Sequence, residues 1–193
     1  MTTPMMATHP QEQDEVDLAR QAFHDVEAFA ELYRRNLTRV YRYHMAHVGN
    51  ARDAEDLTSQ TFMAALEGIR SFRGTGSFAA WLFGIASKKR LMFFRSSGSR
   101  PEVPLDAAVQ TPSPDLGTDK AAYHRLQLEA VSHALRQIST ERAEALILTY
   151  FGGLSQAEAG RVLNKSEAAV KMLISRGLQD LRERTSLALE VEL

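Results

Sequence analysis

A proline-rich stretch in the second half of the sequence limits what the chain can fold into more than any other feature. Residues 96–119 contain Pro101, Pro104, Pro112 and Pro114 among Ser, Thr, Gly and Asp. Proline fixes its own φ angle and lacks a backbone N–H, so such a stretch cannot continue a helix and is typical of an extended connector. We therefore expect the 193 residues to form two small domains joined by this connector.

Both sides of the connector have the spacing of amphipathic helices, and no strand-like alternation competes with it. Before it, apolar residues recur at intervals of three and four: Val26, Phe29, Ala30, Tyr33, Leu37, Val40 and Tyr41. Asn50 is expected to cap a second helix that ends near Ile69, and Ser77 a third that ends near Arg95. We predict an all-α protein with a disordered or frayed leader at 1–20, helical domains at 21–96 and 120–185, a Pro-rich linker at 97–119 and a tail at 186–193.

The second domain contains the pattern of a helix-turn-helix. Ser155 and Glu158 have the spacing of a capping box at the start of a short helix. Asn164 and Lys165 are expected to form a tight turn, after which Ser166 caps a longer helix. This order of elements is typical of a DNA-reading unit, although packed helical hairpins share it. The expected inward residues of the last helix are Val170, Leu173, Ile174, Leu178 and Leu181, and the outward ones include Lys171, Ser175 and Arg176.

Charge is segregated along the chain, although the formal net charge is only -1. Residues 68–101 contain no Asp or Glu but include Arg70, Arg73, Lys88, Lys89, Arg90, Arg95 and Arg100. A local basic stretch favours a polyanionic ligand such as nucleic acid, and the alternative is a solvated basic surface. The preceding helix is the reverse, because Asp53, Asp56 and Gln60 share an acidic face that is expected to be exposed.

Several classes of protein are excluded. The sequence contains no cysteine, which rules out disulfides, thiolate metal sites and a cysteine nucleophile. His44 and His47 have no metal-binding pattern around them, so we interpret them as surface or half-buried histidines and expect no metal or other cofactor. No apolar stretch is long enough to cross a bilayer, and residues 1–13 lack the pattern of a secretory signal. We expect a cytoplasmic protein that is not an enzyme.

Several linked motifs resemble the extracytoplasmic-function (ECF) sigma factors of bacterial RNA polymerase. Asp53–Phe62, Phe72–Gly74 and Phe78–Ala86 resemble domain two of these factors, and Leu154–Glu158 followed by Val170, Lys171 and Arg176 is similar to the promoter-reading half of their domain four. The resemblance covers residues 29–184. It implies a protein that binds core RNA polymerase and promoter DNA, with the first domain at the minus-ten element and the second at the minus-thirty-five element. It also implies an anti-sigma protein as a candidate partner, and no small-molecule substrate.

The resemblance assigns roles to individual residues. Asp53, Asp56 and Gln60 correspond to the face that docks on the polymerase. Arg73, Lys88, Lys89 and Arg95 are implied to hold the melted non-template strand of the minus-ten element. Trp81 can stack on a base there, but its apolar neighbours favour a core position. In the second domain, the residues implied to contact duplex DNA are Ser166, Lys171, Ser175 and Arg176.

The sequence departs from the family pattern at four positions. Lys88 and Met92 stand where Asn and Asp are usual, so the family's minus-ten preference cannot be carried over. Gly160 replaces an Ala, which is expected only to loosen its helix. Lys165 replaces a buried Ile of the turn, and an exposed charge beside the DNA is expected there.

A second hypothesis is a dimeric transcriptional regulator that binds duplex DNA through the helix-turn-helix and carries an N-terminal sensor. It accounts for the second domain. It leaves unexplained why the first domain contains a basic helix without acidic residues. Co-purification with core RNA polymerase discriminates between the two, because only a sigma factor requires it.

Overall fold

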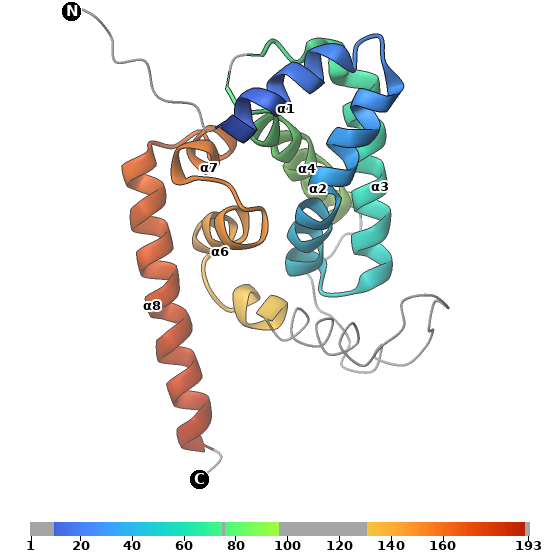
Figure 1. The fold of residues 1–193 in the computed structure, drawn as a ribbon. Helices are drawn as coiled ribbons and strands as arrows, with labels where there is room; N and C mark the ends of the chain where they lie inside the picture. The colour runs from blue at the N-terminus through green and yellow to red at the C-terminus, as the bar shows by residue number, and fades with distance from the viewer. Residues whose placement is uncertain (1–9, 75, 97–130, 192–193) are drawn as a thin grey trace, which may run out of the picture.

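The computed structural model describes residues 10–74, 76–96 and 131–191, and every regular element in them is helical (Figure 1). The N-terminal half contains α1 (Pro10–Gln21), α2 (Val26–Val48), α3 (Ala51–Gly68), the 3-10 helix η1 (Ile69–Ser71) and α4 (Phe78–Ser96). The C-terminal half contains a helical segment at 131–136, α6 (Thr140–Leu146), the π-helical turn η2 (Ile147–Phe151), α7 (Gln156–Leu163) and α8 (Glu167–Val191). The predicted all-α class with two helical domains is confirmed, and the predicted linker at 97–119 lies outside the described residues.

The ends of α2 and α3 follow from local sequence. Asp25 caps α2, because its Oδ1 accepts a hydrogen bond of 2.9 Å from the Glu27 N–H. Gly49 ends α2 with a φ of 73°, which the left-handed region allows glycine without strain. Asn50 then begins α3, since its Oδ1 accepts from the Asp53 N–H at 2.9 Å. The predicted cap at Asn50 is confirmed.

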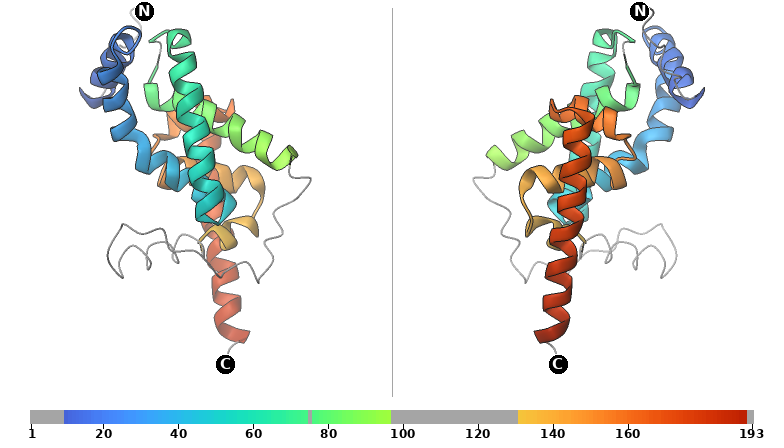
Figure 2. Two further views of the ribbon diagram at one scale, coloured as in Figure 1. Left: turned by 90° about the vertical axis from the view of Figure 1, so that its right-hand side faces the viewer. Right: turned by 90° about the vertical axis from the view of Figure 1, so that its left-hand side faces the viewer.

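The predicted disordered or frayed leader at 1–20 was wrong in part. Residues 10–20 are not disordered, because they form most of α1, which packs Val16 and Ala19 into the core at 7% and 0% exposure. At the other end, residues 186–191 continue α8, since no glycine or proline follows Gly177 to stop the helix. Figures 1 and 2 show the C-terminal part of α8 extending away from the other helices. In the described residues no helix has both the length and the hydropathy of a membrane span.

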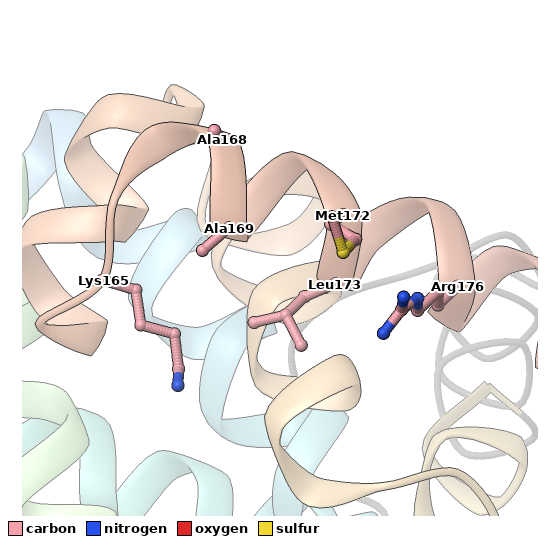
Figure 3. A pocket seen from close by; sticks show the side chains of 6 residues that line it. All are labelled: Lys165, Ala168, Ala169, Met172, Leu173 and Arg176. Carbon is pink, nitrogen blue, oxygen red and sulfur yellow. The ribbon is translucent and has the colours of Figure 1, made fainter.

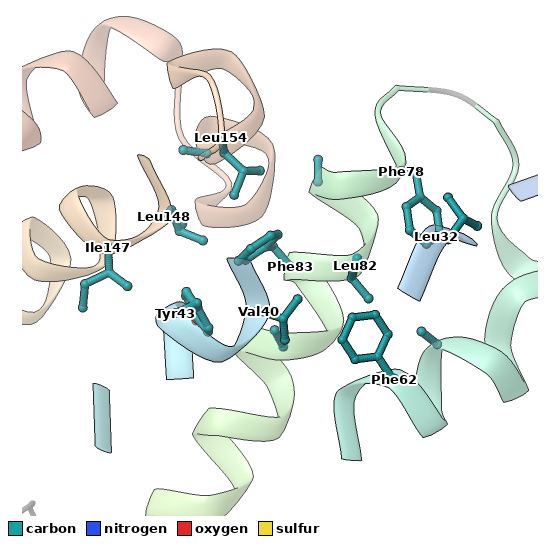
Figure 4. Packing of buried hydrophobic residues seen from close by; sticks show 14 of the residues in the cluster. Leu32, Val40, Tyr43, Phe62, Phe78, Leu82, Phe83, Ile147, Leu148 and Leu154 are labelled. Atoms are coloured by element: carbon teal, nitrogen blue, oxygen red, sulfur yellow. The ribbon is translucent and has the colours of Figure 1, made fainter. Parts of the chain in front are cut away.

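The two halves pack on each other around a shared apolar core (Figure 4). Tyr43 of α2 and Phe83 of α4 are fully buried, with ring centroids 5.4 Å apart, and they face Leu148 and Leu154 of the C-terminal half. Burying one such side chain contributes about 1.5–3 kcal/mol relative to leaving it in water. The contact between the halves therefore has the apolar character of a protein core.

Candidate nucleic-acid interface

Helices α7 and α8 form the helix-turn-helix that the sequence predicted. Ser155 and Glu158 make the reciprocal capping box at the start of α7, so this prediction is confirmed. Asn164 ends α7 in the left-handed conformation with a φ of 53°. Ser166 then caps α8 by accepting a 3.2 Å hydrogen bond from the Ala169 N–H. The turn is thus fixed on both sides by local hydrogen bonds.

Gly160 is required by the geometry of this turn. The Gly160 carbonyl accepts a 2.8 Å hydrogen bond from the Lys165 N–H, and a Cβ on Gly160 would lie 2.7 Å from the Lys165 carbonyl oxygen. The interpretation that Gly160 merely loosens its helix was therefore wrong, because glycine here permits a close approach of two backbone segments.

We expect Gly160→Ala to lower the free energy of unfolding by about 1–3 kcal/mol, because the backbone must move to admit the methyl group. A matched control is Gly84→Ala in α4, where a new Cβ would meet no atom within 4 Å. That variant should gain up to about 1 kcal/mol from the higher helix propensity of alanine. Urea unfolding followed by circular dichroism measures both, and a stabilised Gly160→Ala variant would contradict the close-approach argument.

The outer face of α8 is open to solvent. Val170 and Ile174 turn into the core, whereas the side chains of Ser166, Lys171, Ser175 and Arg176 are all exposed. Beside this face lies a hollow of about 370 Å³, lined by Lys165, Ala168, Ala169, Met172, Leu173 and Arg176. Figure 3 shows Lys165 and Arg176 at the two ends of this row, with apolar side chains between them. The α8 face thus combines flanking positive charge with a central apolar surface.

Lys165 differs from the sequence expectation. Its ammonium lies 2.9 Å from the Glu141 carboxylate, and its side chain is only 32% exposed. The expectation of an exposed charge at the turn was therefore wrong, because Glu141 at the start of α6 pairs with it. A partly exposed ion pair of this kind contributes little to stability.

The predicted acidic face lies on the outside of α3. Its inner residues Leu57, Thr61 and Ala65 are buried, as the helical spacing predicted. Asp56 is exposed and accepts a 2.8 Å hydrogen bond from Gln60, which is half-buried. Asp53 is held at the first turn, where it accepts from the Asn50 side chain at 2.8 Å. The three residues form a polar surface that contributes nothing to the apolar core.

Helix α4 distributes its basic residues over two faces. Lys88 and Arg95 are exposed, Lys89 is half-buried, and Arg73 is exposed just before the helix. Trp81 is half-buried, and its ring lies 5.6 Å from Phe72 and 5.5 Å from Phe78 between centroids. The Trp81 ring therefore packs against the core along part of its surface.

Arg90 is the basic residue that the sequence pattern placed wrongly. It belongs to the basic stretch, yet it is only 8% exposed because it turns toward the C-terminal half. Its guanidinium lies 3.0 Å from the carboxylate of Glu144 on α6, which is 3% exposed. Glu144 also accepts a 2.7 Å hydrogen bond from the Tyr43 hydroxyl and lies 3.2 Å from His47 Nε2. No sequence signal pairs these four residues, since α6 is far along the chain from α2 and α4.

The Glu144 carboxylate is held in its charged form. Burial alone would raise its pKa, but His47, Arg90 and the Tyr43 hydroxyl together lower the pKa of Glu144 to about 2. Burial lowers the pKa of His47, so this histidine is neutral near pH 7. The cluster therefore contains one negative charge, on Glu144, and one positive charge, on Arg90.

His44 is fully buried, so its interpretation as a surface or half-buried histidine was wrong. Its Nε2 lies 3.0 Å from the Thr61 hydroxyl, which donates its own proton to the Leu57 carbonyl at 2.7 Å. Thr61 must then accept from His44, which assigns the proton to Nε2 and leaves Nδ1 bare. Burial, followed by the influence of His47 and Arg90, lowers the pKa of His44 to about 3. His44 is thus a neutral core residue.

Two family models match the chain in the order of its two halves. The sigma-70 region 2 model matches residues 32–100, and the sigma-70 region 4 model matches residues 128–181. The first match contains the acidic face of α3 and the basic helix α4. The second contains the helix-turn-helix.

Two individual proteins that are similar to the chain are also RNA polymerase sigma factors. The chain is 35% identical over 158 residues to the ECF RNA polymerase sigma factor BldN of Streptomyces coelicolor, covering 81% of this chain and 60% of BldN. It is 33% identical over 155 residues to the ECF RNA polymerase sigma factor SigE of Mycolicibacterium smegmatis, covering 79% of this chain and 60% of SigE. The chain therefore spans only about three fifths of the length of either relative.

A solved structure agrees as well. CnrH, solved in complex with the cytosolic domain of CnrY, is 26% identical and superposes with a TM-score of 0.71 over 90% of this chain and 98% of CnrH. The fold of both halves together is thus one that a known protein adopts. With sigma-70 regions 2 and 4 in one chain and two ECF relatives at 33–35% identity, the chain belongs to the sigma-70 family of RNA polymerase sigma factors, in its ECF group.

Proposed function

We propose that this chain binds core RNA polymerase and directs promoter-specific transcription initiation, as a specificity factor and not as an enzyme. The observation that carries the proposal is the pairing of two family regions whose polar faces are both open to solvent. The outer face of α3 carries Asp53, Asp56 and Gln60, and the outer face of α8 carries Lys171 and Arg176. Such a factor works where the polymerase and the chromosome are, so we propose a cytoplasmic location.

A transcription assay tests the proposal directly. Core RNA polymerase supplemented with the chain should initiate on a defined subset of a random-sequence DNA library, with transcripts that begin at fixed positions. Core polymerase alone should show no such selection. Indistinguishable transcript sets from the two reactions would contradict the proposed function.

The outer face of α3 is proposed to dock on the polymerase. Asp56 and Gln60 hydrogen-bond to each other on the outside of α3, so a partner can engage them at little cost to the fold. Asp53 stands at the first turn of α3, where its charge also favours the helix dipole. A charged and polar face of this kind is suited to steering association with a complementary surface.

The exposed basic residues around α4 are proposed to hold the melted strand of the minus-ten element. Arg73, Lys88 and Arg95 can contact phosphates, and half-buried Lys89 can add to their field. Trp81 is half-buried beside Phe72 and Phe78, so the exposed part of its ring can offer a stacking surface to a base. Lys88 adds affinity without base readout, so sequence preference at this element must come from other residues.

The outer face of α8 is proposed to read duplex DNA at the minus-thirty-five element. Ser166, Lys171, Ser175 and Arg176 all project from the exposed side of the helix. A helix of this kind fits the major groove of duplex DNA. Lysine and arginine there contact phosphates or guanine, and serine contacts phosphates or base edges. The apolar centre around Met172 can meet thymine methyl groups.

Lys171→Ala and Arg176→Ala are expected to weaken promoter binding, each in one of two ways. Loss of a phosphate contact should reduce the slope of log affinity against log salt concentration by about one, whereas loss of a base contact should cost about 1–3 kcal/mol at one base pair only. Titrations of a promoter duplex at several salt concentrations distinguish the two. Arg42→Ala, an exposed arginine on α2, is the control and should bind as the wild type does. Wild-type binding by both α8 variants would remove these contacts from the account.

The alternative hypothesis, a dimeric regulator that binds duplex DNA, would use only the outer face of α8 and leaves the polar face of α3 and the exposed basic residues around α4 unaccounted for. It requires a two-fold interface and no polymerase contact. The family resemblance leads us to include an anti-sigma protein among the proposed partners. CnrH, which is similar to this chain, was itself solved in complex with another protein domain, the cytosolic domain of CnrY. Such a partner would bind the chain when it is not engaged with polymerase.

A further inference from the structure

Lys165 stands at the end of the α8 surface that is expected to enter the DNA groove. It directly precedes Ser166, which caps α8, and a recognition helix meets base edges with its N-terminal residues. Its side chain lines the hollow of about 370 Å³ together with that of Arg176, and Figure 3 shows the two at opposite ends of one row. Lys165 therefore lies on the same surface as the proposed DNA contacts of α8.

The backbone of Lys165 is fixed, whereas its side chain has room to move. The Lys165 N–H donates to the Gly160 carbonyl at 2.8 Å, and the Lys165 carbonyl oxygen also lies close to Gly160, so the turn holds this residue in place. The side chain is 32% exposed and borders the hollow. A lysine side chain is a flexible stem with a point charge at its end. Its ammonium can therefore change partners without any movement of the turn.

Glu141 holds that ammonium in the free chain. The Glu141 carboxylate lies 2.9 Å from Lys165 Nζ, and its side chain is 65% exposed at the start of α6. An exposed pair of this kind stabilises the fold little, because water and salt screen it. The pair therefore separates at small cost when a stronger anion approaches. A DNA backbone is such an anion, since it carries one negative charge per about 1.7 Å of helix axis.

We propose, on the basis of the proposed function of the outer face of α8, that Lys165 is a further phosphate contact and that Glu141 competes with DNA for it. In the free chain the Lys165 ammonium pairs with Glu141. On duplex DNA the same ammonium moves to a backbone phosphate, which leaves the Glu141 carboxylate unpaired beside like charges. Glu141 thus weakens binding to duplex DNA of any sequence.

The exchange of partners has a signature in the salt dependence of binding. A lysine that neutralises a phosphate releases about one cation from DNA, which steepens the plot of log affinity against log salt concentration by about one. In the wild type this release is offset, because the freed Glu141 carboxylate keeps a cation beside the phosphates. Without Glu141 the release is no longer offset. The salt slope therefore separates an exchanging pair from a lysine that never meets DNA.

Binding titrations with the full chain and a fluorescent duplex of random sequence test the exchange, at salt concentrations between about 0.05 and 0.3 M. Glu141→Gln should raise the affinity about two- to tenfold at the lowest salt concentration and steepen the salt slope by about one. Lys165→Gln should lower the affinity by a similar factor, since it leaves Glu141 unpaired. The Glu141→Gln, Lys165→Gln double variant should return to the wild-type affinity and slope.

Glu67→Gln is the matched control, because it removes one exposed carboxylate from α3, outside the helix-turn-helix. Its affinity and salt slope should equal those of the wild type, which excludes a change in net charge as the cause. The Glu141 side chain is 65% exposed, so Glu141→Gln should keep the helical circular dichroism signal and the melting temperature of the wild type.

A Glu141→Gln variant with the wild-type affinity and slope would overturn the exchange, as would a double variant that keeps the steeper slope. If the free chain binds duplex DNA too weakly to titrate, the same variants are compared in complex with core polymerase, on a template from the library assay, with the same expected order. Absence of duplex binding in both forms removes Lys165 as a DNA contact.

The two proposals fail separately. Selective initiation in the library assay, together with an unchanged salt slope for Glu141→Gln, would contradict the exchange alone. A steeper slope for Glu141→Gln in a chain that selects no templates would contradict only the proposed function.

Discussion

The Asp56→Arg, Gln60→Arg double variant is expected to lose about 2–4 kcal/mol of binding free energy for core RNA polymerase, a drop in affinity of about 30- to 1000-fold. Both side chains lie on the outside of α3 and bond chiefly to each other. Their replacement therefore leaves the buried residues Leu57, Thr61 and Ala65 untouched. Fluorescence anisotropy of the labelled chain, titrated with core polymerase, measures the loss.

Two controls make this result specific. The variant's helical circular dichroism signal and melting temperature should remain close to those of the wild type, because exposed Asp56 and half-buried Gln60 both lie outside the apolar core. The Glu27→Arg, Thr38→Arg double variant adds the same net charge at exposed positions of α2 and should bind polymerase normally. An Asp56→Arg, Gln60→Arg variant with wild-type affinity would show that this face is not the docking surface.

Acid is expected to destabilise the chain steeply through His44. Its pKa is about 3 in the fold against an ordinary value of 6.5, so between these values the unfolded chain binds a proton that the folded chain does not. Stability is then fully present above pH 6.5 and falls by about 1.4 kcal/mol per pH unit as the pH drops below it. Between pH 7 and pH 5 the loss from this group should reach about 2 kcal/mol. Urea unfolding at a series of pH values measures it.

Other groups act in the same direction. Burial also lowers the pKa of His47, which adds to the loss over the same range. The pKa of Glu144 is about 2 against an ordinary 4.5, so its contribution is present above pH 4.5 and is lost only below it. His44→Gln should reduce the slope of the unfolding free energy against pH above pH 5 by the equivalent of about one proton. His24→Gln, at an exposed position, should leave this slope unchanged. Equal slopes in wild type and His44→Gln would exclude His44 as the cause.

The features that could be predicted from the sequence depend on residues that lie close together in the chain. The caps at Asn50, Ser155 and Ser166 each act within three residues, so their side chains alone identify the helix starts. The inward stripe of α8 likewise follows from a period of 3.6 residues. The acidic and basic faces are patterns of the same kind, and their exposure follows once the apolar stripe is known.

What could not be predicted depends on residues far apart in the chain. Tyr43 and Glu144 are separated by 101 positions, and no periodicity connects them. Arg90 stands among exposed basic residues, and only the packing of α6 shows that it turns inward. The need for glycine at position 160 could not be predicted, because the close approach of the Lys165 backbone exists only in the folded turn. The helix at 10–20 was missed because its polar composition outweighed the spacing of Val16, Ala19 and Ala22.

Direct binding of the purified chain to core RNA polymerase that carries no other sigma factor is the measurement closest to the central claim. Sedimentation analysis of the mixture is predicted to show a one-to-one complex that forms without DNA, and this complex should start transcription at fixed positions on the selected templates. A chain that sediments apart from the polymerase, or that binds duplex DNA as a dimer in its absence, would contradict the claim that it is a sigma factor.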